Sequence, residues 1–329
     1  EKNTATFIKD YYSNLDCKVR DCGDCYGIIV DINPDKPGKK LAWRADFDGL
    51  AIQEDNDLPF KSQNPGVMHA CGHDGHTAYL LVLAKCLIEL KDEINGSIRI
   101  IHQPAEEVAP GGALSMIKDG ALDGVDDIYG IHVMSTMPAG TIQRHSGPTQ
   151  TGRANFDLTF TGKGGHASMP QLSNDAIVAG SYFVTELQTI VSRRLNPFDV
   201  GSVTIGSFDG AGSYNAIKGQ VKLKGDVRVM NEDTRKNIRQ QIEQIVNGVD
   251  ATFGVESQLD YDDNYPVLIN DKKLTENAEK WIKESNIPEV TAVKDSGVVN
   301  ASEDFAYFAQ KKPGCFFYVG CQPADGGIY

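Results

Sequence analysis

Short apolar runs alternate with helical patterns along the first part of the chain. Four such runs predict buried strands, at Ile28–Ile32, Leu41–Ala45, Ile98–His102 and Ile128–Val133. Helical spacing predicts helices over residues 4–15 and 111–119, and the almost wholly apolar run Ala78–Leu90 predicts a buried helix. Strands that alternate with helices are typical of a largely parallel sheet.

The pattern changes after Gly147-Pro148, where apolar and polar residues alternate strictly from Ala154 to Phe160, as in a half-buried strand. The elements predicted after it are a helix, two strands, a second helix and a final strand, at Asn174–Leu195, Val200–Phe208, Val221–Val229, Glu232–Phe253 and Val255–Tyr261. This β-α-β-β-α-β order is ferredoxin-like. The α/β pattern then resumes with a helix at Leu274–Glu284 and a strand at Cys315–Val319. We therefore expect an α/β protein with a mostly parallel-sheet domain of residues 1–148 and 263–329, and an inserted ferredoxin-like satellite domain of residues 149–262.

Composition narrows the function classes. The net charge of −13 argues against a nucleic-acid partner, and no apolar run reaches the ~18 residues of a membrane span. No signal-peptide pattern opens the chain, and seven cysteines, an odd number, favour a reducing compartment, so we expect a cytoplasmic protein. Cys17, Cys22 and Cys25 suggest a zinc knuckle, but a second cysteine pair is lacking, which favours unpaired thiols.

Candidate metal ligands gather at predicted strand ends. The segment Met68–Thr77 holds three of the seven histidines and one cysteine, together with two glycines that allow a tight turn. Asp46 and Asp48, Glu106 and Glu107, and His132 lie at or near the carboxyl ends of three strands, where ligand sites of open α/β sheets are found. The candidate ligands are Cys71, His73, Glu107 and His132, a donor set that suits zinc, cobalt, nickel or manganese. On an extended backbone Glu106 points away from Glu107, so one carboxylate can bind metal while the other takes a proton from water.

Other polar residues allow more than one interpretation. His166 lies in the glycine-rich segment Gly162–Ser168, which lacks the Walker pattern of a phosphate loop and favours a loop that presents a histidine to a ligand. Arg228 could bind a carboxylate or form a surface salt bridge. The remaining histidines are expected to be structural or to support metal ligands; they are His69, His76, His102 and His145.

Six motifs run in order along nearly the whole chain: Arg44–Asp48, Met68–His76, Gln103–Glu107, Gly130–Val133, Gly164–Ala167 and Ser302–Phe305. Together they resemble the aminoacylase and carboxypeptidase superfamily of dinuclear metallohydrolases, in particular its N-acyl-amino-acid amidohydrolases, hippurate hydrolases and auxin-conjugate hydrolases. The resemblance implies two divalent ions, of zinc, manganese, cobalt or nickel, bound by the four candidate ligands, with Glu106 as general base. It also implies that His166 steadies the oxyanion or the substrate carboxylate, that Asn215 and Arg228 contact this carboxylate, and that the inserted domain mediates a homodimer.

The function predicted from this resemblance is hydrolysis of the linear amide of an N-acyl amino acid. The alternatives are a metallo-exopeptidase or dipeptidase on the same scaffold and a metal-binding scaffold without catalysis, against which Glu106 argues. The segment around Asn215 departs from the family's usual Asn-Val-Ile-Pro. The family also has an amino-terminal Leu-His-x-His-Pro-Glu segment, expected before Glu1, and a further ligand histidine, expected after Tyr329. A chain that ends at Tyr329 is therefore expected to bind at most one ion tightly.

Overall fold

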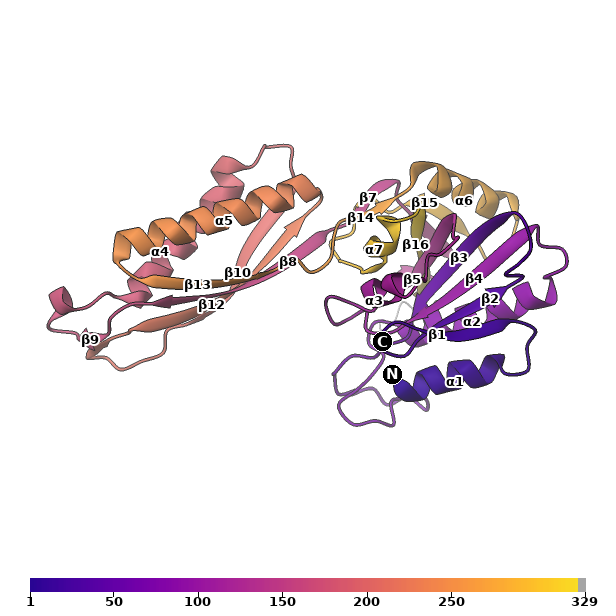
Figure 1. Ribbon diagram of the computed structural model, residues 1–329, viewed down its shortest axis with the longest axis horizontal. Helices are drawn as coiled ribbons and strands as arrows, with labels where there is room; N and C mark the ends of the chain where they lie inside the picture. The colour runs from indigo at the N-terminus through magenta and orange to yellow at the C-terminus, as the bar shows by residue number, and fades with distance from the viewer. Residues whose placement is uncertain (325–329) are drawn as a thin grey trace. The chain divides into compact units, whose positions relative to one another are not determined.

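The computed structural model describes residues 1–324, which divide into two compact units (Figure 1). Unit 1 comprises Glu1–Thr149, Leu268–Val299 and the described residues from Glu303 onward. Unit 2 comprises Gln150–Val267 and Asn300–Ser302. The chain therefore leaves unit 1 and returns to it, so unit 2 is an insertion.

Unit 1 is built on an eight-stranded sheet with the order β1-β2-β4-β3-β5-β16-β6-β15. Its strands are β1 (Lys18–Cys22), β2 (Gly27–Ile32), β3 (Lys39–Asp46), β4 (Gly96–Gln103), β5 (Asp127–Pro138), β6 (Thr141–Arg144), β15 (Ala292–Asp295) and β16 (Gly314–Gln322). The central strands β4, β3, β5 and β16 are parallel, whereas β1 and β2 add antiparallel pairs at one edge. The prediction of an α/β fold with a mostly parallel sheet is confirmed.

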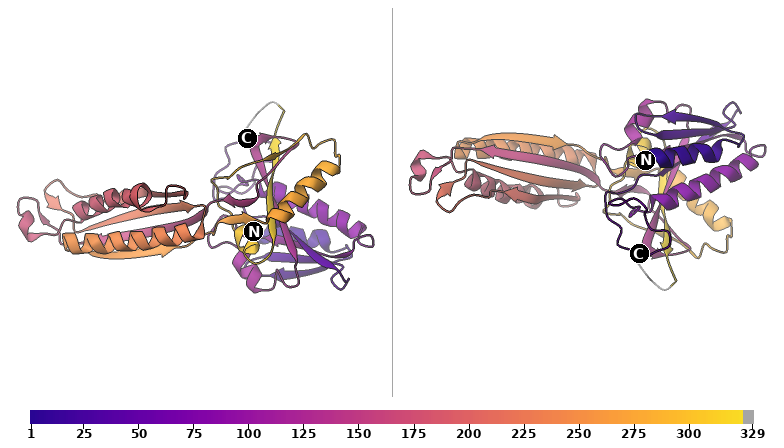
Figure 2. Two further views of the ribbon diagram at one scale, coloured as in Figure 1. Left: turned by 90° about the horizontal axis from the view of Figure 1, so that it is seen from above. Right: turned by 90° about the horizontal axis from the view of Figure 1, so that it is seen from below.

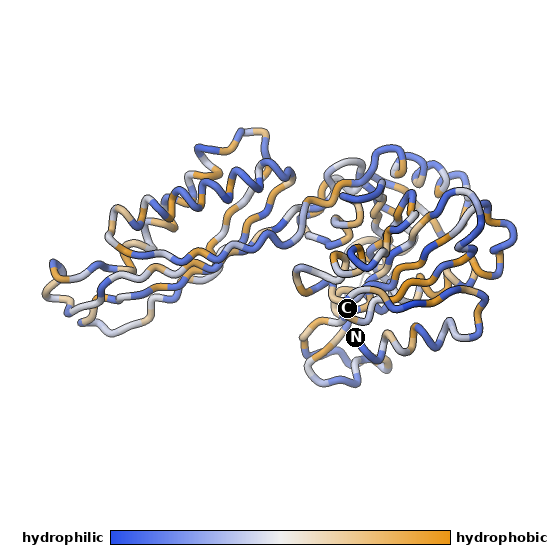
Figure 3. Tube along the Cα trace, viewed as in Figure 1, coloured by the Kyte–Doolittle hydropathy of each residue, from blue (hydrophilic) through white to orange (hydrophobic). Residues whose placement is uncertain are grey.

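Helices cover both faces of this sheet. They are α1 (Lys2–Tyr12), α2 (His73–Glu89), α3 (Ala113–Lys118), α6 (Lys272–Glu284) and α7 (Phe305–Ala309), and a small sheet pairs β7 (Gly147–Gln150) with β14 (Leu268–Asn270). Ile28 and Val30 of β2 pack in a core with α1 and α2, whereas Ile29 packs in the core with α3 and α7. All eight residues of β4 are buried, as expected for a central strand, and Figure 3 shows the apolar residues along these strands.

Helix α2 differs from its prediction. The apolar run Ala78–Leu90 indicated a buried helix, but Val82 is 60% exposed and Leu90 is 50% exposed. Only one face of α2, with Leu80, Leu81 and Ala84, packs into the core. The prediction of a buried helix was wrong because α2 packs on one face of the sheet and, within residues 1–324, its outer side is exposed.

Edge strands were missed for a related reason. In β1 all residues but Cys22 are exposed, so the strand has no apolar alternation that sequence reasoning could detect. The short strands β6 and β15, at the other edge, carry only partly buried or exposed side chains apart from Thr141.

Unit 2 is a four-stranded antiparallel sheet with the order β10-β12-β8-β13, and helices α4 and α5 lie together on one face (Figures 1 and 2). Its elements are β8 (Gly152–Thr161), β9 (Gly165–His166), a 3₁₀ helix (Pro170–Leu172), α4 (Ala176–Thr189), a π-helical turn (Ile190–Arg194), β10 (Gly201–Asp209), β11 (Ala216–Ile217), β12 (Gln220–Val229), α5 (Glu232–Phe253) and β13 (Glu256–Asp262).

The predicted alternation of β8 buries Ala154, Phe156, Leu158 and Phe160 beneath these two helices. Asp175 and Asn231 accept backbone N–H groups at the first turns of α4 and α5, and so fix where each helix begins. The ferredoxin-like prediction is confirmed.

The core of unit 1 contains one histidine that burial keeps neutral. His102 of β4 is fully buried, and its Nε2 lies 2.9 Å from the Tyr12 hydroxyl. Burial lowers the pKa of His102 to about 3. A histidine in the unfolded chain has a pKa of about 6.5, so between these two values only the unfolded state takes up the proton.

We therefore predict that His102 makes folding stability fall as the pH falls below about 6.5, by up to about 1.4 kcal/mol per pH unit. In His102→Gln this contribution is absent, and the free energy of unfolding should depend less steeply on pH. Urea unfolding of both proteins between roughly pH 7 and pH 5, with a chelator present throughout, measures the difference. Equal slopes would contradict the assignment.

Candidate metal centre

A left-handed turn places the first two candidate ligands. Gly72, with φ 88°, precedes α2, so that Cys71 lies on the turn and His73 is the first helical residue. A Cβ atom at position 72 would meet Cγ2 of Val133 at 2.5 Å, so the turn also approaches β5 closely. Only glycine satisfies both the backbone conformation and this contact.

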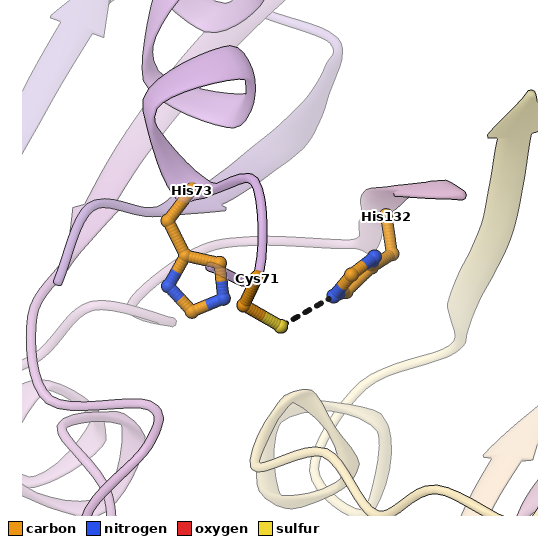
Figure 4. A group of neighbouring side chains, drawn as sticks. All are labelled: Cys71, His73 and His132. Carbon is orange, nitrogen blue, oxygen red and sulfur yellow. Dashed lines mark hydrogen bonds between the residues drawn. The ribbon is translucent and has the colours of Figure 1, made fainter. Parts of the chain in front are cut away.

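The four candidate ligands come together in unit 1. Cys71 Sγ lies 3.3 Å from His132 Nε2, and Figure 4 shows these two side chains and His73 pointing toward one another. His73 Nε2 lies 3.9 Å from Glu107 Oε1. The ligand atoms of Cys71, His73 and His132 are mutually within 4.8 Å, as are those of His73, Glu106 and Glu107. His73 therefore joins two overlapping groups of donors.

Two buried atoms fit a bound cation. Among residues 1–324, His73 Nε2 and Glu107 Oε1 are buried and make no hydrogen bond. Buried polar atoms are rarely left without partners, so both are expected to bind something. Nδ1 of His132 lies 2.6 Å from its neighbour's carbonyl, the Val133 oxygen, and can donate to it, which directs Nε2 toward Cys71. Sulfur, nitrogen and oxygen donors of this kind suit a divalent transition metal.

The two imidazoles differ in protonation. Burial and the nearby His76 lower the pKa of His132, so its Nε2 is available as a ligand. Burial would also lower the pKa of His73, but the hydrogen bonds with Asp48 and Cys71 and the charges of Asp46 and Asp48 together outweigh burial, and the pKa is raised to about 12. A metal that binds His73 must displace a proton, so metal affinity should fall as the pH falls.

Two aspartates hold the ligands in place, and sequence reasoning did not assign them this role. Asp48 Oδ1 lies 3.1 Å from His73 Nδ1, and Asp48 Oδ2 accepts the backbone N–H of Glu107 at 2.9 Å. Asp46 lies 2.5 Å from His76 Nδ1, and His76 Nε2 accepts the N–H of Val133 at 2.9 Å. The signal in the sequence was the Asp-x-Asp spacing at the end of a strand. Carboxylate–histidine pairs of this kind orient metal ligands.

Glu106, the neighbour of Glu107 in sequence, is the more deeply buried of the two carboxylates. The preceding Ala105 has φ 57°, a left-handed conformation that non-glycine residues rarely adopt and that is found often at functional sites. Glu106 is 6% exposed, and its carboxylate lies within 4.8 Å of the carboxylates of Glu303 and Asp304. Burial and these neighbours raise the pKa of Glu106 well above its usual value, which strengthens it as a base.

The remaining candidates belong to unit 2. Ser168 Oγ lies 2.8 Å from His166 Nδ1, and the carbonyl of Asn215 accepts the N–H of Ala167, so His166 and Asn215 are neighbours. Arg228 instead pairs with Asp226 at 2.9 Å and contacts Ser302 at 3.2 Å.

Within unit 2, Arg228 lies apart from the other two candidates. Arg228 lies near the end of β12 and pairs with Arg153 of β8. At the opposite end of β12, Gln220 pairs with Thr161, and β8 continues from Thr161 toward His166. Eight residues of strand separate these ends, roughly 26 Å at 3.3 Å per residue. Unit 2 therefore brings His166 and Asn215 together but not Arg228.

The other histidines are mostly engaged in structure. His76 supports β5, His102 lies in the core, and His145 pairs with Asp295 at 2.8 Å. His69 is exposed and lines a cavity of about 1110 Å³ beside α1. The cysteines of the suggested zinc knuckle are free thiols, and Cys22 is buried in the core with α3.

An α/β unit that gathers thiolate, imidazole and carboxylate donors beside a second buried carboxylate defines a metal-dependent hydrolase. Comparison with known sequences supports this class. Residues 42–329 match Peptidase family M20/M25/M40, and the chain belongs to this family. The resemblance inferred from the motifs is confirmed, as is the prediction of a hydrolytic enzyme.

Two similar proteins are named for acyl-amino-acid chemistry. An N-acyl-L-amino acid amidohydrolase of Geobacillus stearothermophilus is 43% identical over 235 residues, which are 71% of this chain and 64% of that protein. An N-acetyl-L-cysteine deacetylase of Bacillus subtilis is 35% identical over 320 residues, 97% of this chain and 76% of that protein.

Crystal structures show the same fold. A protein of methicillin resistant Staphylococcus aureus superposes with a TM-score of 0.94 at 52% identity, covering 100% of this chain and 84% of that one. The YXEP protein of Bacillus subtilis, a dinuclear metal binding peptidase of the M20 family, has a TM-score of 0.81 at 28% identity and covers 97% and 82% of the two chains.

We predict that Asp48→Asn weakens metal binding by about 10–100-fold, because Asp48 orients both His73 and the backbone of Glu107. Titration of the purified protein with Zn²⁺ or Mn²⁺ in a competing chelator measures the dissociation constant. Asp74→Asn is the matched control, since Asp74 is an exposed carboxylate next to His73 that accepts the N–H of Gly75. Equal affinity in the two variants would remove Asp48 from the support of the site.

Proposed function

We propose that this chain hydrolyses the linear amide of an N-acyl amino acid, releasing a carboxylate and the free amino acid. The observation that carries the proposal is the division between two adjacent carboxylates. Glu107 directs a buried oxygen with no hydrogen bond toward His73, whereas Glu106 also lies beside the buried acids Glu303 and Asp304. A hydrolase needs one carboxylate for metal and one for protons.

The metal chemistry is assigned to Cys71, His73, Glu107 and His132. Divalent ions held there would polarise the amide carbonyl and lower the pKa of an attacking water to about 7. Two ions are supported by the overlapping donor groups that share His73 and by the dinuclear Bacillus subtilis relative. We propose zinc, manganese, cobalt or nickel as the ion. The expected histidine beyond Tyr329, and the expected loss of one metal without it, lie outside the described residues.

Glu106 is the proposed general base. Its carboxylate accepts a proton from the attacking water and delivers it to the nitrogen of the departing amino acid. The raised pKa of Glu106, caused by burial and by the neighbouring Glu303 and Asp304, favours the uptake of that proton. A metal-binding scaffold without catalysis would have no use for this carboxylate.

His166 and Asn215 are proposed to contact the substrate from unit 2. His166 is exposed, and its ring is oriented by Ser168. An exposed imidazole can steady a developing oxyanion or a substrate carboxylate. We retain Arg228 as a carboxylate contact, with its pairing to Asp226 as the competing role. Unit 1 is thus the proposed catalytic domain (residues 1–148 and 263–329) and unit 2 the satellite (149–262).

An exopeptidase or dipeptidase is the second candidate function. Chains named thermostable carboxypeptidase are 33% identical to this one over 330 residues. The substrate differs only in what lies on either side of the amide bond, so a panel of N-acetyl amino acids and dipeptides, assayed with added divalent metals, separates the two. Faster hydrolysis of the dipeptides would favour the peptidase.

We predict that Glu106→Gln lowers turnover by about 10²–10⁴-fold, because the amide keeps the shape of the side chain but cannot accept a proton. Metal content and the unfolding curve should match the wild type, which makes both measurements internal controls. Turnover near that of the wild type would place the base elsewhere.

We also propose a homodimer through unit 2 and a cytoplasmic location. Strands β10 and β13 each pair with one neighbour in the sheet of unit 2, so each offers an edge. Exposed apolar residues lie on α4, among them Ile177, Val178 and Tyr182.

No helix within residues 1–324 is long and apolar enough to cross a membrane.

Light scattering of the purified protein is predicted to give twice the mass of the chain. Tyr182→Glu, which places a charge on the exposed apolar side of α4 where Tyr182 is 54% exposed, should shift the equilibrium toward monomer. Glu186→Lys, a charge change at an exposed polar position of the same helix, serves as the control. A monomer at high concentration would count against the dimer.

A further inference from the structure

Arg44 is a fully buried cation at the centre of the sheet of unit 1. Its Nη1 donates to Asp46 at 2.7 Å, its Nη2 donates to Asp304 at 2.7 Å, and the same Nη2 lies 2.9 Å from Glu303. Nε donates to the side chain of Gln103 at 2.8 Å. The planar guanidinium therefore binds four partners at once, a fork of donors that a lysine ammonium cannot reproduce.

These partners come from three segments that are distant in sequence. Arg44 and Asp46 lie on β3, Gln103 ends β4, and Glu303 and Asp304 precede α7, with 260 positions between Arg44 and Asp304. Gln103 also donates to both carboxylate oxygens of Asp304, at 2.8 and 2.7 Å. The segment of Glu303 and Asp304 is thus attached to the sheet by polar contacts with Arg44 and Gln103.

One branch of the network leads to a candidate metal ligand. Asp46 uses one oxygen for Arg44 and the other for His76 Nδ1. His76 in turn accepts the N–H of Val133, the residue after His132. Arg44 fixes Asp46, Asp46 fixes the tautomer of His76, and His76 fixes the backbone that carries His132.

A second branch leads to Glu106. Its carboxylate lies within 4.8 Å of Glu303 and Asp304, and Arg44 binds both of these acids. Without Arg44, three buried carboxylates would face one another with strong repulsion, and Glu106 would be displaced. Its position therefore depends on Arg44, whose partners Asp46, Gln103, Glu303 and Asp304 are not candidate metal ligands.

We propose that Arg44 is a positioning residue for hydrolysis, which orients His132 through Asp46 and His76 and keeps Glu106 in place through Glu303 and Asp304. The inference rests on the proposed function for its catalytic part. Its metal part does not, because the orientation of His132 affects metal binding whether or not the protein cleaves an amide.

The chain offers a matched control in Arg99, a second buried arginine of the same sheet. Arg99 lies on β4, pairs with Asp31 at 2.7 and 3.0 Å, and donates to the backbone carbonyls of Gly120, Ala121 and Asp123. None of these partners is a candidate metal ligand or supports one. Loss of Arg99 thus costs stability alone, whereas loss of Arg44 should change the site.

The experiment compares Arg44→Lys, Arg44→Met and Arg99→Met in the full chain. Zn²⁺ dissociation constants, the visible spectrum of bound Co²⁺, and kcat and KM on an N-acetyl amino acid are measured on the folded fraction of each. We expect Arg44→Lys to weaken Zn²⁺ binding by about 10–100-fold and to lower kcat more than it raises KM. The Co²⁺ spectrum should shift. Arg99→Met should lower the melting temperature and leave the other readouts at wild-type values.

Asp46→Asn replaces Arg44→Met if Arg44→Met does not fold, since Asp46→Asn tests the His132 branch with a nearly isosteric side chain. Wild-type Zn²⁺ affinity and Co²⁺ spectrum in Arg44→Lys would overturn the proposal, as would equal losses in Arg99→Met. If the wild-type protein cleaves no N-acyl amino acid, the proposed function is overturned. If Arg44→Lys still loses Zn²⁺ affinity in that case, the role of Arg44 in positioning the metal ligands stands.

Discussion

Negative charge buried beneath the carboxyl ends of β3 and β4 is the constraint on which the rest of unit 1 depends. Asp46, Asp48, Glu106, Glu303 and Asp304 are each at most 6% exposed. A buried carboxylate is costly unless a cation or hydrogen-bond donors compensate it. Arg44 compensates one part of the cluster, and His73 and His76 compensate another. A divalent cation beside Glu107 would add further positive charge, so the residues proposed for catalysis also take part in compensating the buried carboxylates.

The burial of apolar side chains explains which parts of the fold could be predicted from the sequence. The alternating pattern of β8 and the apolar run of β4 follow from the burial of their side chains, and both strands were predicted. Exposed edge strands such as β1 have no such pattern of apolar residues. The exposed face of α2 was missed because apolar residues such as Val82 also occur on surfaces, where they are common in folded proteins.

The site was readable to a similar degree. The donor types and their placement at strand ends indicated Cys71, His73, Glu107 and His132, and the structure brings them together. The supporting roles of Arg44 and Asp304 were not readable, because a polar residue in a sequence gives no sign that it is buried or which distant partner it meets. The separation of Arg228 from His166 follows from strand geometry, which a list of motifs does not contain.

Gly72 has an evolutionary consequence. Its left-handed backbone conformation is strained for most other residues, and a Cβ atom at this position would also clash with Val133. A smaller residue at position 133 would relieve the contact and leave the backbone strain, so no single compensating change restores a substituted turn. Sequence drift can therefore replace the donors on either side of the turn more easily than the turn itself. In lineages that descend from this chain, a change of metal preference should come through new side chains at positions 71 and 73, carried on an unchanged loop.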